Sequence, residues 1–149
     1  MKWIKSLVYL ALSGLTFHFF LSMNGLHWQD LWDLPSALMI VAGWLFTLVN
    51  YPLSEISKAF LQSMGLNQAA QVPSLSALIL KNIGQNGLLA GGICTLVGVV
   101  QALGNLDDMG ALGAALAISF LGLLYALCFN FGVILPLQNA LQRLIGTEY

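Results

Sequence analysis

Residues 109–142, MGALGAALAISFLGLLYALCFNFGVILPLQNALQ, contain no charged side chain and decide the fold. A helix needs about 20 mostly apolar residues to cross the hydrocarbon core of a bilayer. Other charge-free windows cover residues 6–29, 34–54, 59–80 and 82–106. All of them pass this test except 59–80, which is rich in Gln, Asn and Ser. We therefore predict an all-α polytopic membrane protein with four transmembrane helices, near residues 4–22, 34–52, 86–104 and 110–137.

The composition separates the chain from soluble proteins. Of its 149 residues, 58% are hydrophobic and 7% are charged, whereas about 25% of the residues in a soluble domain are charged. A domain of this size needs a solvated exterior, which so few charges do not supply. The net charge of -1 also leaves no basic surface for phosphate binding. The composition thus argues against a soluble enzyme and against a nucleic-acid-binding protein.

The first apolar window begins like a secretory signal, because Lys2 and Lys5 precede it. No small-x-small cleavage site follows, and Phe17, Phe19 and Phe20 occupy the region where one would lie. We therefore expect this window to be retained as the first transmembrane helix.

The basic residues predict the orientation of the spans. With four spans, both termini and the segment 53–85 lie on the same side of the membrane. That side holds all five basic residues, Lys2, Lys5, Lys58, Lys81 and Arg143. The other side holds Asp30, Asp33, Asp107 and Asp108, and no basic residue. Because short cytoplasmic loops carry the excess of Lys and Arg, we predict that both termini are cytoplasmic.

Residues 53–85 form the one sizeable cytoplasmic segment, which we expect to be helical. Ser54 suits the N-cap of an amphipathic helix that runs to Met64. Gly65 then suits the end of that helix. A second helix is expected to start near Pro73 and to continue into the third span.

The third and fourth spans are predicted to form an antiparallel hairpin, because residues 105–109 make a tight external turn. In both spans, small or weakly polar residues recur at steps of three and four, which places them on one helical face. They are Gly84, Gly87, Gly91, Cys94, Thr95, Gly98 and Ala102 in the third span, and Ala115, Ser119, Gly122, Ala126 and Asn130 in the fourth. Such faces serve helix packing in most membrane proteins. The alternative is a lumen that holds another helix and lets water and ions pass.

Neither face carries an ionisable side chain. Ion carriers normally need one at membrane depth, so an ion-carrying carboxylate would have to come from another protein. Cys94 and Cys128 are expected to be buried free thiols. His18 and His27 lack companions at the spacing of metal ligands. We therefore predict no metal site and no cofactor, and no enzymatic activity, since no nucleophile–base pair is within reach.

Several motifs in spans two to four occur in the order of a known family. They are DLPSALMIVAG at 33–43, Tyr51-Pro52-Leu53, GGICTLVGVVQALGNLDD at 91–108, and Tyr125 and Pro136 within 113–137. These stretches resemble the second, third and fourth helices of the MotA/PomA flagellar stator subunits. Those subunits belong to the wider MotA/TolQ/ExbB proton-channel family. Four predicted spans favour its Mot branch over the three-span ExbB and TolQ type.

The resemblance implies a single MotA-like membrane domain over residues 1–149, in the bacterial inner membrane. Five such subunits would surround the transmembrane helix of a single-span B-type partner, of the MotB or ExbD kind. The partner would bring the ion-carrying aspartate, and proton or sodium flow would drive a motor or energy-transducing complex. The channel lumen and the contact with the partner helix would involve Gly91, Thr95, Gly98, Ser119, Gly122 and Asn130.

Three departures from the family pattern motivate a second hypothesis. Leu88 stands where the family has a proline, and Gly122 and Leu123 stand where it has a threonine pair. The segment 53–85 is short and holds three charged residues, so direct contact with a flagellar rotor is not expected. The chain is therefore interpreted as a minimal ion-driven motor subunit or, alternatively, as a non-conducting membrane scaffold derived from the same family.

Overall fold

The computed structural model describes residues 2–25, 27–66 and 72–145, and within these ranges it contains helices and no strand, which confirms the all-α prediction. The elements are α1 (Lys2–Met23), the 3-10 turn η1 (Trp28–Leu31), α2 (Leu34–Leu45), α3 (Thr47–Asn50), α4 (Leu53–Ser63), α5 (Pro73–Leu103), α6 (Met109–Phe129), the π-helix η2 (Asn130–Ile134) and α7 (Leu135–Ile145).

Two helices are long and apolar enough to cross a membrane. They are α5 and the continuous run of α6, η2 and α7 over Met109–Ile145. A third candidate is Leu34–Asn50 together with Leu53–Ser63, but this pair bends by 106°. α1 has 22 residues, and its described apolar stretch is Ala11–Met23. The chain thus has the helices of a membrane protein, with two or three candidate spans, and the fourth stays a prediction.

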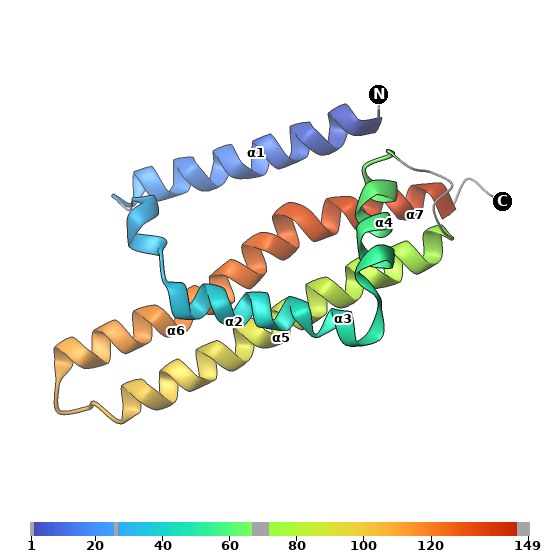
Figure 1. The fold of residues 1–149 in the computed structure, drawn as a ribbon. Coiled ribbons are helices and arrows are strands. Elements are labelled where there is room, and N and C mark those ends of the chain that lie inside the picture. Colours follow the sequence, from blue (N-terminus) through green and yellow to red (C-terminus); the bar gives the residue numbers. More distant parts are fainter. Residues whose placement is uncertain (1, 26, 67–71, 146–149) are drawn as a thin grey trace.

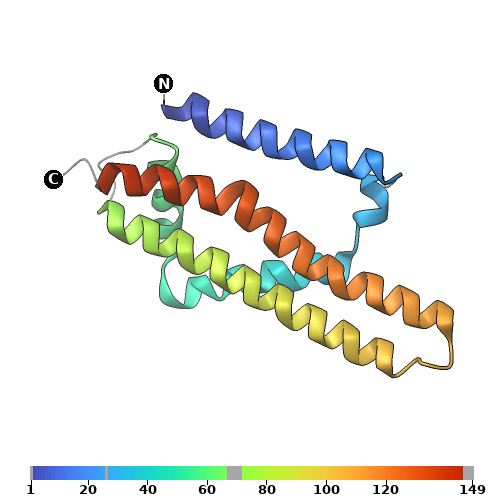
Figure 2. The ribbon, with the colours of Figure 1, turned by 180° about the vertical axis from the view of Figure 1, so that it is seen from behind.

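The α5–α6 hairpin is the longest part of the molecule, with its two helices side by side and antiparallel (Figure 1 and, from behind, Figure 2). Its turn ends at Asp108, whose carboxylate accepts hydrogen bonds from the backbone N–H groups of Gly110 at 2.9 Å and Ala111 at 3.1 Å. Aspartate is a favoured N-cap because it satisfies N–H groups that have no partner in the first helical turn. The predicted hairpin and its tight turn are confirmed.

α2 packs against both helices of this hairpin. Asp33 caps α2 by accepting a 2.8 Å hydrogen bond from the Ser36 N–H, and Pro35 lies in the first turn, where a missing N–H costs least. The span predicted near 34–52 corresponds to the helical run Leu34–Asn50, after which the chain bends. Tyr51 is extended, with φ of -135° and ψ of 132°, because the ring of Pro52 disfavours a helical conformation in the residue before it.

The segment 53–85 contains the helix α4 that the sequence predicts, but its cap is different. Pro52 occupies the N-cap position and makes no side-chain cap hydrogen bond, so the prediction of a Ser54 cap is wrong. Gly65 ends the helix as predicted, with φ of +77°. At that end the Leu66 N–H donates to the Leu61 carbonyl at 2.9 Å, a bond that satisfies one of the last carbonyls of a helix.

α5 also begins as predicted, at Pro73, and runs without interruption to Leu103. The buried Ser76 hydroxyl donates a 2.5 Å hydrogen bond to the Gln62 side chain and so ties α5 to α4. The main hydrophobic cluster lies nearby, where α4, α5 and α7 meet. Its buried members are Ala59, Ile79, Leu80, Ile83, Ile134, Leu137 and Leu141.

The π-helix η2 interrupts the path from α6 to α7, which the sequence predictions did not foresee. Pro136 lies two residues after its end and has no N–H to donate to the preceding turn, while its ring crowds the carbonyl four residues earlier. Widening the helix ahead of the proline relieves this crowding, and π-bulges commonly occur at such breaks.

The distal half of the hairpin is apolar and largely uncovered by the rest of the chain. Leu96, Val97, Val100, Leu103 and Phe120 are all exposed there. α1 runs along η2 and α7 (Figure 1). In this contact the ring centroids of Tyr9 and Phe131 are 5.9 Å apart. These faces are available to lipid or to other membrane helices.

Candidate functional site

Gly91 and Gly122 lie at the centre of the contact between α5 and α6. A Cβ on Gly91 would lie 2.8 Å from the Cβ of Ala126 and 3.0 Å from the Gly122 carbonyl oxygen. A Cβ on Gly122 would lie 2.7 Å from the sulfur of Cys94. The two backbones can therefore approach this closely only because neither position carries a side chain, as in other small-residue contacts of membrane helices.

Gly98 and Ser119 form a second close contact, nearer the hairpin turn. A Cβ on Gly98 would overlap that of Ser119 and would lie 2.7 Å from its Cα. Ser119 is fully buried, and its hydroxyl donates a 2.7 Å hydrogen bond to the Leu116 carbonyl of its own helix. The hydroxyl is thus satisfied without a partner outside α6.

Asn130 and Thr95 contribute the polar atoms of the predicted set. The Asn130 side-chain amide donates to the Gly84 carbonyl of α5 at 3.2 Å. The Thr95 hydroxyl donates to the Gly91 carbonyl at 3.0 Å, within α5. Thr95 is half-buried, at the edge of the α5–α6 contact. On the neighbouring face of α5 there is open space, because no atom lies within 4 Å of a Cβ placed on Gly92.

The structure thus brings Gly91, Gly98, Ser119, Gly122 and Asn130 together between two helices of one chain, with Thr95 beside them. Their small size serves α5–α6 packing, which is the common role of such faces. Their part in a lumen stays a prediction. Of the two cysteines, both free, Cys94 is half-buried, but Cys128 is exposed on α6, so its predicted burial is wrong.

A polar latch between α6 and the start of α2 was missed from the sequence. The Tyr125 hydroxyl accepts a 2.8 Å hydrogen bond from the Asp33 N–H and donates to the Leu31 carbonyl. Buried Ser36 lies nearby and donates to the Ile118 carbonyl at 3.4 Å. The motif at 33–36 therefore has a structural role, because it caps α2 and fixes it against the middle of α6.

A second missed feature is a pair of hydrogen bonds between side chains of α5 and the segment Thr47–Tyr51 at the end of α3. Asn86 donates to the Thr47 hydroxyl at 3.0 Å, and Asn82 donates to the Tyr51 hydroxyl at 3.1 Å. The sequence signal for these bonds is a spacing of four residues. Asn82 and Asn86 lie one turn apart on α5, and Thr47 and Tyr51 are also four residues apart, so the polar groups on each side can face each other. These bonds hold the segment before the 106° bend against α5.

Lys58 is on α4, Lys81 is near the start of α5 and Arg143 is in the last turn of α7, so all three are on the helices that meet around the main hydrophobic cluster, whereas Asp107 and Asp108 are in the turn between α5 and α6. Between these charged positions, residues 82–106 and 109–142 carry no charge. The arrangement can pack helices and bind apolar surfaces, but these two stretches offer no Asp, Glu, His, Lys or Arg side chain for carrying an ion.

Comparison of the chain with protein-family models, with curated proteins and with solved structures finds no match in any of the three.

Proposed function

We propose that the chain is the A-type subunit of an ion-driven membrane complex, in which several copies surround the transmembrane helix of a single-span partner. The observation that carries this proposal is an unpartnered small face on α6. Gly110, Gly113, Ala114 and Ala117 are exposed, and nothing lies within 4 Å of a Cβ placed on Gly113. Small residues spaced four apart let another helix approach closely in a membrane, where lipid supplies no hydrophobic drive.

The partner is part of the proposal because the chain lacks a charge at membrane depth. Ion transfer normally requires a charged or readily protonated side chain there, such as Asp, Glu or His, and the windows 82–106 and 109–142 contain no Asp, Glu, His, Lys or Arg. A partner helix with a carboxylate would supply it. The resemblance to MotA/PomA subunits supports the same arrangement, with a pentamer in the bacterial inner membrane, both termini cytoplasmic, and proton or sodium as the ion.

Native mass spectrometry of the full chain in mild detergent tests the assembly. We expect a pentamer, and we expect Gly113→Leu to shift it to the monomer because leucine would keep a neighbouring helix away. Gly14→Leu on α1 is the matched control, since nothing lies within 4 Å of a Cβ there either. A wild-type chain that is a stable monomer or dimer would overturn the proposal.

The second candidate is a non-conducting scaffold of the same architecture. It is favoured by the use of Gly91, Gly98, Ser119 and Gly122 in packing within the chain. Such a scaffold would hold helices together without passing ions.

The ion flux of complexes that carry the Thr95→Ala variant distinguishes the conducting subunit from the non-conducting scaffold. In proteoliposomes that contain the chain with a single-span partner from its gene neighbourhood, a conducting role predicts a flux about three- to eighteenfold lower than wild type. This range corresponds to the loss of about 0.6–1.7 kcal/mol for one polar contact between membrane helices. Thr16→Ala is the control, because the Thr16 hydroxyl also bonds within its own helix, to the Ser13 carbonyl at 2.9 Å, but Thr16 lies on α1, outside the α5–α6 faces. Equal flux in both variants would favour the scaffold.

A further inference from the structure

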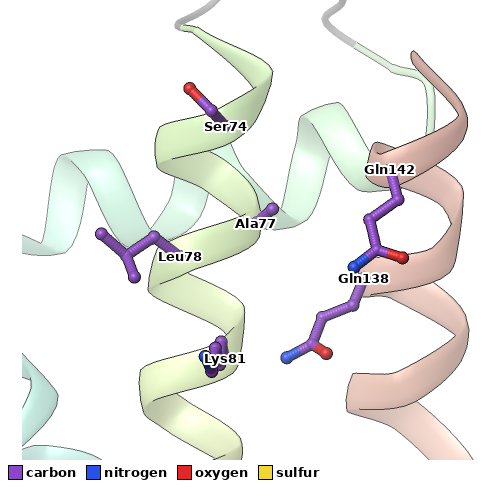
Figure 3. Close-up of a pocket in the computed structure, with 6 residues that line it drawn as sticks. All are labelled: Ser74, Ala77, Leu78, Lys81, Gln138 and Gln142. Carbon is purple, nitrogen blue, oxygen red and sulfur yellow. The ribbon is translucent and has the colours of Figure 1, made fainter. Parts of the chain in front are cut away.

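A groove between α5 and α7 lies at the end of the hairpin that carries the basic residues. It has a volume of about 220 Å³ and is lined by Ser74, Ala77, Leu78 and Lys81 of α5 and by Gln138 and Gln142 of α7 (Figure 3). The groove lies on the flank of the α5–α7 contact, and neither the small faces nor the α2 contacts belong to it.

The lining of this groove suits an anion. It offers one ammonium group, two side-chain amides and one hydroxyl, and it contains no carboxylate. Lys81 is exposed and forms no salt bridge with any residue in the described ranges. A phosphate could therefore accept hydrogen bonds from the lysine and from both glutamines, and bonds to a charged group are the stronger ones.

Apolar surface continues from the groove toward the hairpin turn. Leu88 and Leu89 follow Lys81 by about two turns on the same side of α5, and both are exposed. On α7, exposed Leu135 lies one turn before Gln138. The polar groove thus lies where the charge-free window of α5 begins. This order of a polar site followed by apolar faces matches a phospholipid, whose headgroup lies at the interface and whose chains enter the core.

We propose that the groove binds the phosphate headgroup of an anionic phospholipid. The apolar faces beside it favour a lipid over free phosphate, and basic pockets between helices on the cytoplasmic side are suited to anionic headgroups. The proposal depends only on the chain being in a membrane, so it is independent of ion conduction and of the number of subunits.

Thermal unfolding of the full chain in detergent, titrated with dihexanoyl phosphatidylglycerol, tests the site. We expect saturable stabilisation, with phosphatidylcholine acting more weakly at the same concentrations. Lys81→Gln should raise the half-saturating concentration about fivefold, the contribution of one basic residue near an anionic lipid surface. Lys81→Arg should retain binding. Lys58→Gln is the matched control, because Lys58 is an exposed lysine of α4 outside the groove.

Three results would overturn the proposal, provided that far-UV circular dichroism shows the variants to be folded. The first is an equal weakening by Lys58→Gln and Lys81→Gln, which would indicate general electrostatic attraction. The second is an equal response to phosphatidylglycerol and phosphatidylcholine. The third is equal stabilisation by inorganic phosphate, which would assign the groove to a free anion.

Discussion

Gly98→Ala is expected to lower the free energy of unfolding by about 1–3 kcal/mol, the usual cost of overpacking a close contact. The added Cβ would overlap that of Ser119 and would lie 3.2 Å from the Ser119 backbone nitrogen. Because the obstacle includes backbone atoms, a change of rotamer cannot relieve it, and α5 and α6 must move apart. Unfolding by added dodecyl sulfate in mixed micelles, followed by tryptophan fluorescence, measures the loss.

Gly92→Ala is the matched control for this substitution. Gly92 lies in the same helix, but nothing lies within 4 Å of a Cβ placed there, and alanine favours a helix over glycine. Its stability should equal or exceed that of the wild type. The double variant Gly98→Ala with Ser119→Gly should recover part of the loss, because contacting positions are not additive. Equal stabilities for Gly98→Ala and Gly92→Ala would show that the α5–α6 contact is looser than described.

Tyr125→Phe is expected to cost about 1–3 kcal/mol, because removing one hydroxyl leaves two part-buried backbone groups without a partner. Those groups are the Asp33 N–H and the Leu31 carbonyl. The same change should accelerate hydrogen exchange in residues 28–36, since the latch holds this segment against α6. Mass spectrometry of the exchanged peptides measures that effect separately from global stability.

Tyr9→Phe is the corresponding control. The Tyr9 hydroxyl donates a longer bond, 3.4 Å, to the Phe131 carbonyl at an exposed site. Its loss should change stability by less than about 0.5 kcal/mol, as for most surface substitutions. Similar losses in the two variants would indicate that the Tyr125 latch has no special role.

The hairpin was predictable because its signals are local. Two charge-free windows separated by NLDD predict two apolar helices and a turn, and Pro73 and Gly65 mark helix ends through their own backbone properties. The break after Asn50 also had a local signal, the Tyr51-Pro52 pair, and the second span is accordingly predicted to end near residue 52, with a new helix after it. The 106° angle between the two helices depends on how α4 packs against α5 and α7, which no local signal gives.

The long-range pairs were not predictable in the same way. Tyr125 and Asp33 are 92 residues apart, and Asn86 and Thr47 are 39 apart, so their bonds depend on how α2 lies across the hairpin. The small faces present a different difficulty. Periodicity correctly groups Gly91, Gly98 and Gly122, but close packing within a chain and close packing between chains require the same residue types.

α5 is one uninterrupted helix, whereas the neighbouring run from α6 to α7 is interrupted by η2. At 1.5 Å per residue the 31 residues of α5 extend about 46 Å, whereas the hydrocarbon core is about 30 Å thick. The excess length lies in an unbroken helix that is tied to α4 by Ser76. The antiparallel run beside it is interrupted by the π-helix η2, where the regular α-helical hydrogen bonding is broken. If the membrane part of α5 tilts, the start of the same continuous helix moves with it, and the Ser76–Gln62 bond carries α4 along. The interruption at η2 allows the run from α6 to α7 to bend instead of tilting as one body.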